Sequence, residues 1–467
     1  MKDWKKGMSQ RFEPNDLAEL KDMYDVIVIG SGGAGLTSAI QASELGLKPV
    51  ILEKMSTVGG DTKRDSSGMN AAETFVQTEH GIEDSVGKFY YETLRGGHGQ
   101  NDPELLKYFT EHSSRAIEWL YKEGVQLDDL TITGGMSVPR THRPHTTEPI
   151  GAYLVNGLLE QVRAKQIPLF CGAKVTAING QDKVSGVQVQ TANGNQAIQS
   201  KAVIIATGGF GANKALLAQY RPDLSKYKTT NQPGNTGDGI LMAEDIGAQV
   251  VDMDQIQFHP TVQQDTDHVY LIGETVRGEG AILVDQDGKR FVNEMETRDK
   301  VTNAINKLGG TGAYLIFDQS VRDRAKAIDF YNSVGLVKSG SDLGELAEKS
   351  GIDGEMLNQA VDKWNRSVSD RLDMAFGRKT GLHVLDKPPY YSIHISPAVH
   401  YTMGGVKTND QTQVLKSGGE PIQGLYAAGE VVGGLHGSNR IGGNSIAETV
   451  IFGLRAAQQV RDYFFDM

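Results

Sequence analysis

A glycine-rich segment near the start of the chain has the spacing of a phosphate-binding loop. Gly30, Gly32 and Gly35 form the pattern G-x-G-x-x-G, in which glycines let backbone N–H groups approach a pyrophosphate at the positive end of the following helix. The same pattern also occurs in ordinary tight turns, so its surroundings decide the interpretation. Glu53 stands 23 residues after Gly30, close to the ~20 expected for the acid that binds ribose hydroxyls. The segment predicts a dinucleotide site.

Arginine and histidine side chains later in the chain could bind a carboxylic acid. The forked guanidinium of Arg298 or Arg440 matches a carboxylate with two parallel hydrogen bonds, and His259 and His400 could add further donors. Taken one at a time, each could equally be a buried structural histidine or a solvated arginine. Because arginine has a pKa above about 12, residue type alone does not nominate it as an acid.

The elements around the glycine segment predict a strand–helix–strand unit. Residues 24–29 form an apolar, β-branched run, typical of a strand buried in a parallel sheet. A helix is expected over residues 36–45 and a second strand over residues 49–52. Residues 202–209 and 424–430 repeat the pattern of a buried strand that ends in glycine. These segments indicate an α/β fold.

Other segments show where helices and an insertion lie. Pro103 opens a predicted amphipathic helix over residues 103–123, and a closing helix is expected over residues 444–463. Residues 184–200 are typical of a hairpin. Between about 250 and 385 the chain has charged helical stretches and fewer strand–helix–strand signals, which predicts an inserted lobe.

Composition excludes several classes of protein. With 467 residues, 39% of them hydrophobic and 22% charged, the chain is long enough for two or three packed lobes. Its net charge of −11 argues against a nucleic-acid partner or an anionic membrane surface. A single cysteine, Cys171, excludes four-cysteine iron–sulfur and zinc sites, and we expect no metal. No run of 18 apolar residues or signal peptide is apparent, so we expect a cytoplasmic protein without a membrane span.

Six groups of motifs recur in one order along the chain. They are 59–63 (GGDTK) with 68–72 (GMNAA), 257–261 (QFHPT), 274–280 (ETVRGEG), 293–299 (NEMETRD), 400–405 (HYTMGG) and 438–445 (SNRIGGNS). Together they resemble the flavoprotein family of fumarate reductases and succinate dehydrogenases, and most closely its soluble flavocytochrome c fumarate-reductase branch without the haem domain. The resemblance covers nearly the whole chain from residue 24 onward.

The resemblance implies a two-domain architecture. A Rossmann-like FAD-binding domain, residues 24–250 and 386–467, would be interrupted by an α+β capping domain, residues 251–385. Residues 1–23 would form an N-terminal extension. The active site would lie where the two domains meet, as small-molecule sites often do.

The resemblance also implies a reaction, the reduction of fumarate to succinate. In this family the flavin N5 passes hydride to one carbon of the C=C bond while an arginine protonates the neighbouring carbon. By position, Arg298 is the proton donor, and Glu274 and Arg277 are the relay that reprotonates it. The residues implied around the substrate are His259, Gly273, His400, Arg440 and Gly443.

The cofactor contacts are likewise carried over by position. Glu53 and Lys54 would bind the adenosine ribose, Val175 would line the adenine pocket, and Glu430 would bind the ribityl hydroxyls. The remaining FAD contacts that the resemblance implies are Gly30, Gly32, Gly33, Ala34, Gly35, Gly60, Thr62, Lys63, Met69, Asn70, Ala71, Thr207, Gly208, Thr236, Gly237, Asp238, Arg440, Ser445 and Ile446.

Two departures from the family pattern refine these expectations. Membrane-bound relatives tether FAD to a histidine before the threonine that corresponds to Thr62, but Asp61 stands there, so we expect non-covalent FAD. Gly273 replaces a threonine that helps to hold one fumarate carboxylate in relatives. Another unsaturated acid of the acrylate, cinnamate or urocanate type is therefore the alternative substrate.

Three further matters stay open at this level. An L-aspartate-oxidase-like enzyme and a non-catalytic flavin electron-transfer subunit are lesser alternatives. Gly442 and Gly443 match the reductase side, and the retained His259 and Arg298 argue against a non-catalytic subunit. We expect an external electron donor, which could be a reduced nicotinamide, free flavin or a separate redox protein.

Overall fold

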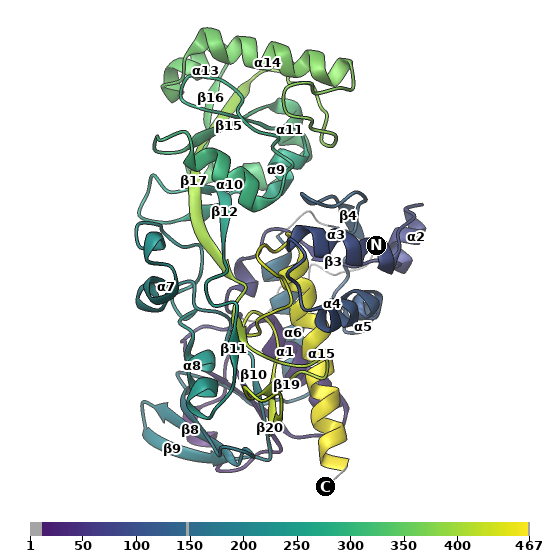
Figure 1. Cartoon of the computed structure of the whole chain (residues 1–467), viewed down its shortest axis with the longest axis vertical. Coiled ribbons are helices and arrows are strands. Elements are labelled where there is room, and N and C mark those ends of the chain that lie inside the picture. The colour runs from purple at the N-terminus through teal and green to yellow at the C-terminus, as the bar shows by residue number, and fades with distance from the viewer. Residues whose placement is uncertain (1–11, 146–148, 466–467) are drawn as a thin grey trace.

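The computed structural model describes residues 12–145 and 149–465. Residues 1–11 of the expected N-terminal extension lie outside these ranges. Figure 1 shows an elongated molecule with two lobes, in which strands β12 (Ile256–Gln263) and β17 (Tyr390–Thr402) run from one lobe towards the other. The glycine-rich segment and the C-terminal helix lie in the lower lobe.

The lower lobe is built on a six-stranded sheet in the order β19-β20-β10-β1-β2-β6. Strands β1, β2, β6, β10 and β20 pair in parallel, and β19 is antiparallel. Val28 of β1 lies in register between Ile51 and Ile204, and all four residues of β1 are buried. The bounds are β1 Val26–Ile29, β2 Pro49–Glu53, β6 Leu169–Cys171, β10 Ala202–Ile205, β19 Gln413–Leu415 and β20 Pro421–Ala427.

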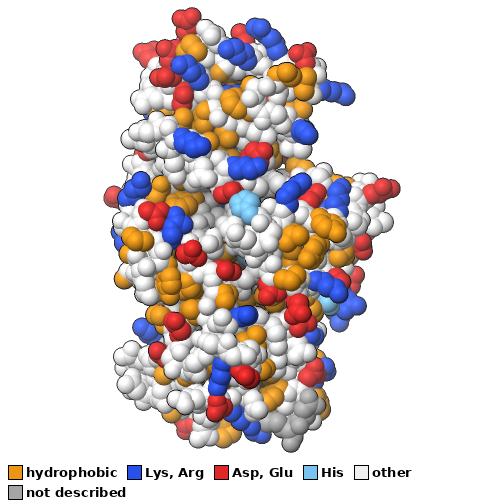
Figure 2. All heavy atoms as spheres, viewed as in Figure 1, with side chains coloured by type: hydrophobic (Ala, Val, Ile, Leu, Met, Phe, Trp, Pro, Cys, Tyr) orange, Lys and Arg blue, Asp and Glu red, His pale blue; other side chains and the backbone are white. Residues whose placement is uncertain are grey.

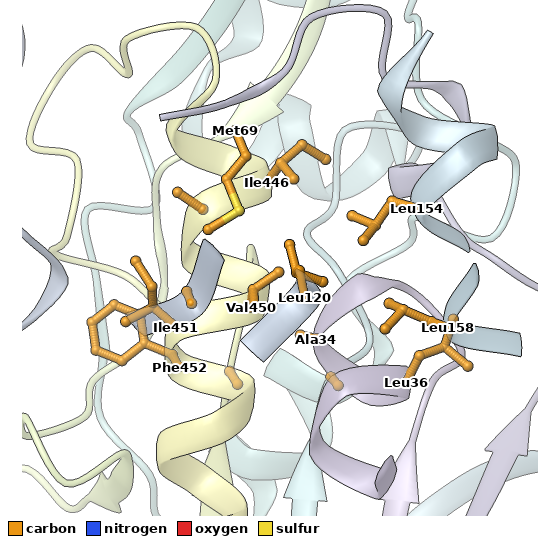
Figure 3. Packing of buried hydrophobic residues seen from close by; sticks show 14 of the residues in the cluster. Ala34, Leu36, Met69, Leu120, Leu154, Leu158, Ile446, Val450, Ile451 and Phe452 are labelled. Carbon is orange, nitrogen blue, oxygen red and sulfur yellow. The ribbon is translucent and has the colours of Figure 1, made fainter. Parts of the chain in front are cut away.

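Helices α1 (Gly33–Glu44), α6 (Ile150–Ala164) and α15 (Asn444–Phe465) pack beside this sheet. Figure 3 shows Ile446 and Val450 of α15 pointing towards Ala34 and the neighbouring core. This packing holds the start of α15 close to the glycine-rich turn. A dinucleotide site can then use both the turn and the helix N-terminus.

The upper lobe contains an antiparallel sheet in the order β13-β12-β17-β15-β14, with β16 also paired to β17. Residues 390–395 of β17 pair with β15, while residues 396–402 pair with β12. One strand therefore belongs to both lobes, and the domain boundaries at residues 250 and 385 stay predictions. The bounds are β13 Tyr270–Leu271, β14 Ile282–Val284, β15 Ala313–Asp318 and β16 Lys338–Gly340.

Six helices belong to this lobe, and two of them, α9 and α10, supply Glu274, Arg277 and Arg298. Their bounds are α9 Glu274–Gly278, α10 Arg298–Asn306, α11 Gln319–Arg324, α12 Ala327–Ser333, α13 Leu343–Ser350 and α14 Gly354–Ser369. A core that includes Trp364, Phe317 and Ile393 holds the lobe together. The expected α/β class with an inserted α+β lobe is confirmed.

The predicted helix over residues 103–123 is wrong in its length. Two helices, α4 (Pro103–Glu111) and α5 (Ser113–Lys122), are separated at His112. Ser113 Oγ donates to Thr110 O at 2.9 Å, and such local side-chain hydrogen bonds compete with the regular helix. The expected start is confirmed, because Asp102 caps α4 and Pro103 begins it.

The remaining elements are short. They are α2 Phe75–Glu79, α3 Val86–Gly96, α7 Lys214–Tyr220, α8 Asp238–Asp245, β3 Met69–Asn70, β4 Asp129–Thr131, β5 Thr141–Arg143, β7 Lys174–Asn179, β8 Gly186–Thr191, β9 Gly194–Gln199, β11 Val250–Val251, β18 Gly405–Val406, and the 3-10 turns Leu17–Glu19, Thr62–Arg64 and Pro222–Leu224. Strands β8 and β9 form the expected hairpin.

The surface carries charges of both signs. Figure 2 shows acidic and basic side chains interspersed over the face in view. Among the described residues, no helix combines the length and the apolar character needed to cross a bilayer.

Candidate active site

A cavity of about 730 Å³ begins at the carboxyl ends of β1, β2 and β10 and extends to the capping lobe. Many of the predicted site residues contribute to its wall: Gly30, Gly32, Gly33, Ala34, Glu53, Lys54, Gly60, Thr62, Lys63, Val175, Thr207, Gly208, Asp238, His400, Glu430, Arg440, Ser445 and Ile446. Other predicted residues are outside this wall: Gly35, Met69, Asn70, Ala71, Thr236, Gly237, His259, Gly273, Glu274, Arg277, Arg298 and Gly443.

The glycine-rich turn has the close packing that a dinucleotide cradle requires. A Cβ at Gly30 would lie 2.4 Å from Ala206 O, and one at Gly35 would lie 2.0 Å from Gly30 O. At Gly32 a Cβ would meet only Thr62 Oγ1, at 3.7 Å, so that backbone faces the cavity. These residues fit the pyrophosphate of FAD, since the backbone is bare where the ligand would approach.

Acidic and basic groups fit the adenosine end of the same ligand. Glu53 accepts from Ser31 N at 3.0 Å and Ser31 Oγ at 2.6 Å, which joins it to the glycine turn. Lys54 Nζ donates to Thr236 Oγ1 at 2.5 Å and pairs with Asp238 at 2.9 Å. Thr236 does not line the cavity itself, but its hydroxyl group holds the Lys54 side chain, which does.

Two half-buried acidic side chains, Asp61 and Glu430, line the wall of the cavity. Asp61 accepts hydrogen bonds from Gln232 N and Asn235 Nδ2, both at 2.6 Å. Asn235 Nδ2 also donates to Glu430 at 3.1 Å. Burial, together with the nearby Asp61, raises the pKa of Glu430 to about 8. A protonated Glu430 can both donate to and accept from a ligand hydroxyl.

Asn70 fixes the loop that leads into α15. Its Nδ2 donates to Gly442 O at 2.7 Å, and its Oδ1 accepts from Thr141 Oγ1 at 2.6 Å. A Cβ at Gly443 would lie 2.6 Å from Asn70 Oδ1, and Gly443 has φ +85°, so this position favours glycine. The structure brings Asn70 and Gly443 together one layer behind the cavity wall.

The predicted proton donor and its relay lie in direct contact. Arg298 Nε donates to Glu274 Oε1 at 2.5 Å, and Arg277 Nη2 is 3.9 Å from the same oxygen. Arg298 Nη1 donates to Gln257 Oε1 at 3.1 Å. Arg298 Nη2 makes no hydrogen bond with the residues described, so one nitrogen stays available for a substrate atom.

The pKa values of Glu274 and Arg277 are set by burial and by the charges of the groups beside them. Burial opposes ionisation of Glu274, but the guanidinium groups of Arg298 and Arg277 outweigh it and lower the pKa of Glu274. Burial lowers the pKa of Arg277, although Glu274 opposes that effect. A carboxylate between two guanidinium groups, one with a lowered pKa, is arranged to pass a proton.

Two neutral histidines complete the polar surface. Burial and the charge of Arg298 hold the pKa of His259 and of His400 well below the usual value. Thr261 N donates to His259 Nδ1 at 3.3 Å, so the ring carries its proton on Nε2 and can donate from there. The two rings lie edge to face with centroids 5.3 Å apart.

Arg440 is a buried cation with unused donor capacity. Its guanidinium lies 4.3 Å from the centre of the Tyr401 ring, and its Nη1 donates to Ser445 Oγ at 3.1 Å. Its Nε has no hydrogen-bond partner among the described residues. Burial and the neighbouring Arg298 lower the pKa of Arg440 to about 10. The group fits an anionic ligand, which would supply the missing countercharge.

The space beside Gly273 is narrower than its lack of a side chain suggests. A Cβ at this position would lie 3.2 Å from Ser66 Oγ and 3.6 Å from Tyr331 Oη. Gly273 N donates to Tyr331 Oη at 3.1 Å. The hydroxyl groups of two other residues therefore lie next to the position where the resemblance implies a missing threonine side chain.

Sequence reasoning missed several residues that organise the site. Gln257 connects two arginines, because its Nε2 also donates to Arg440 O at 2.6 Å. Gln257 lies two residues before His259 in the same motif, and this spacing places both side chains on one face of a strand, which could have indicated it. Ser66 lies between the motif segments 59–63 and 68–72 but belongs to neither, and Tyr331 is far from every motif, so no local pattern indicates that the two side chains meet.

Comparison with known proteins identifies what this arrangement is similar to. A family described as FAD binding domain matches residues 25–446. The NADH:fumarate oxidoreductase of Klebsiella pneumoniae (strain 342) is 50% identical over 439 residues, which cover 93% of this chain and 47% of that protein. The chain thus spans about half the length of that relative.

Two further relatives match over most of both chains. The urocanate reductase of Eggerthella lenta is 35% identical over 464 residues, covering 97% of this chain and 76% of that protein. A solved structure of the open conformation of a flavocytochrome c3 fumarate reductase has a TM-score of 0.79 and 38% identity, covering 96% of this chain and 79% of that chain. The chain belongs to the FAD-binding flavoprotein family of the fumarate reductases.

Proposed function

We propose that this chain reduces the C=C bond of a small unsaturated carboxylic acid, with fumarate as the substrate and succinate as the product. The observation that carries the proposal is the contact of Glu274 with Arg298, near the buried His259 and Arg440 and the half-buried His400. The overall change adds two electrons and two protons across the double bond. The π bond breaks, and each carbon gains one C–H bond.

FAD is the cofactor that the cradle fits, and we propose that it is bound without a covalent link. When bound and reduced, FAD supplies a hydride to one alkene carbon. Asp61 stands at the position where tethered relatives have histidine, and its carboxylate is engaged by Gln232 and Asn235. A carboxylate held in this way offers no ring nitrogen for a flavin bond.

Arg298 delivers the proton to the second carbon. Its Nη2 is the nitrogen without a partner among the described residues, whereas Nε and Nη1 are held by Glu274 and Gln257. As the guanidinium loses its proton to carbon, Glu274 passes a proton to Arg298 and takes one in turn from Arg277. Arg298 therefore need not persist as a neutral base, which reconciles its role with a high intrinsic pKa.

Arg440 and the histidines hold and polarise the substrate. The free Nε of Arg440 and the Nε2–H of His259 are donors for carboxylate oxygens. Drawing electron density into the carboxylate makes the alkene carbon a better hydride acceptor. Because these groups are buried and fixed, they need no reorganisation as charge develops.

The electron donor is external to the residues of this site. The Klebsiella relative is an NADH:fumarate oxidoreductase, but this chain corresponds to about half of it. We therefore propose that a reduced nicotinamide, free flavin or a separate redox protein reduces the bound FAD.

Anaerobic oxidation of reduced viologen in the presence of fumarate, urocanate, acrylate and cinnamate tests this proposal. Fumarate should give the highest kcat/KM and yield succinate. Turnover of another acid above fumarate would overturn the substrate assignment, and no turnover with any acid would overturn the proposed activity.

A further inference from the structure

A group of unused hydrogen-bond donors surrounds Gly273 in the capping lobe. Tyr331 is 4% exposed, lines the cavity and accepts a hydrogen bond from Gly273 N. Its own hydroxyl hydrogen has no acceptor among the described residues. Ser66 also lines the cavity, and its hydroxyl makes no hydrogen bond with the part of the chain that the structure describes.

A buried cation, Arg143, lies close enough to Tyr331 for the two groups to interact electrostatically. Arg143, at the end of β5, is 6% exposed, and its Nη1 donates to Thr275 Oγ1 at 3.0 Å. Its Nε is buried and has no hydrogen-bond partner within the described ranges. Asp129, its register partner on β4, acts on the charge of Arg143, but no described Asp or Glu lies within ion-pair distance of the guanidinium. A buried guanidinium without an anion is costly unless a ligand supplies the charge.

The acids that act on Arg143 from a distance, Asp129, Asp65 and Glu279, do not pair with it. Asp65 lines the cavity, and its Oδ1 accepts from Ser67 N and Ser67 Oγ, both at 2.7 Å. It is not within ion-pair distance of Arg143. The hydrogen-bond donors around Gly273 therefore outnumber the acceptors that the described residues offer them.

This donor group adjoins the reaction site through the β12–β13 hairpin. Ile272 N donates to Thr261 O at 2.9 Å, and Thr261 N donates to His259 Nδ1. Gly273 follows Ile272 directly and precedes Glu274, the partner of Arg298. Arg440, Tyr331 and Ser66 line the same cavity, so one ligand space connects the reaction site with this donor group.

We propose that Tyr331 and Ser66, backed by Arg143, bind the second carboxylate of a dicarboxylic substrate, the one that Arg440 does not hold. The inference rests on the proposed function for its substrate class. Two hydroxyl donors and a cation select an anionic oxygen group over a methyl or a hydrogen at this position. The site would thereby favour fumarate over an acid with one carboxylate.

Equilibrium binding to the oxidised holoenzyme tests this subsite independently of turnover. Succinate and butyrate differ by one carboxylate, and their binding can be followed by changes in the visible absorption of FAD. Wild type should bind succinate more tightly. Tyr331→Phe and Ser66→Ala should each weaken succinate binding by about 10–150-fold, the range for a hydrogen bond to a charged group. Butyrate affinity should stay within about twofold, since butyrate lacks that group.

Two variants separate the subsite from general structural damage. Ser66→Ala leaves the Tyr331 contact with Gly273 intact, so it tests the donor group without altering that turn. Tyr314→Phe removes a half-buried tyrosine hydroxyl from β15, away from the cavity wall, and should leave both affinities unchanged. Equal weakening of succinate and butyrate, or no weakening of succinate in either subsite variant, would overturn the inference.

The outcome is distinguishable from failure of the proposed function. If wild type reduces no enoate but Tyr331→Phe and Ser66→Ala still weaken only succinate, the subsite stands and the activity does not. If fumarate is reduced but the variants lower kcat/KM for fumarate and for crotonate equally, the activity stands and the subsite does not.

Discussion

Glu274→Gln isolates the proton-transfer role of the carboxylate between Arg298 and Arg277. Glu274 Oε1 lies 2.5 Å from Arg298 Nε and 3.9 Å from Arg277 Nη2, and the side chain is 11% exposed. Glutamine keeps the size and one acceptor oxygen but cannot take up a proton at neutral pH. Loss of general acid–base function typically lowers turnover about 10²–10⁴-fold, which is roughly 3–5 kcal/mol of barrier.

The assay measures anaerobic turnover with reduced viologen beside the rate at which dithionite reduces the bound FAD. Turnover should fall by at least about a hundredfold, while the rate of FAD reduction stays near that of wild type. Glu279→Gln is the matched control, because Glu279 ends the same short helix and pairs with Arg324 near the surface at 3.0 Å. An exposed pair of this kind contributes little, so this variant should turn over normally.

Two results would refute the reasoning about Glu274. The first is turnover of Glu274→Gln within about tenfold of wild type, short of the general-acid range. The second is an equal loss of FAD binding and of turnover, which would show that the substitution disrupts the fold of the site and does not interrupt proton transfer.

The remaining predictions concern the donor, the cofactor and a buried acid. Arg298→Ala should abolish C=C reduction and leave FAD reduction nearly intact; turnover within about tenfold of wild type would remove Arg298 from the mechanism. Acid precipitation should release FAD into the supernatant, because Asp61 cannot tether it; yellow precipitated protein would contradict this. The pKa of Glu430 is raised to about 8, so its contribution to folding is full below the usual carboxyl pKa and is lost as pH rises through about 8. Glu430→Gln should therefore reduce the fall in Tm of the FAD-free protein between about pH 6 and about pH 9, and an unchanged fall would contradict the assignment.

Local sequence patterns predicted the parts of the fold that depend on neighbours in the chain. The run of residues 24–29 and the glycines after it predict β1 and its turn, because burial on both faces and close backbone approach leave few other residue types. The helix break at His112 was missed, since a hydrogen bond from Ser113 to Thr110 does not alter the amphipathic pattern.

The site was predictable only where a motif carries the chemistry within one segment. Arg298 and Glu274 are 24 residues apart, and their contact depends on how α9 and α10 pack. The surroundings of Gly273 were not predictable, because Tyr331 comes from α12 and Ser66 from a loop of the other lobe. Side chains brought together by tertiary packing leave no periodic or spacing signal.

A single-turnover experiment tests the central claim most directly, because it needs no assumption about the electron donor. Enzyme whose FAD has been fully reduced is mixed anaerobically with fumarate, and the return of the oxidised flavin absorption is followed together with the product. The proposed function predicts rapid reoxidation and one succinate for each FAD. Reduced FAD that persists in the presence of fumarate until oxygen is admitted, with no succinate formed, would contradict it.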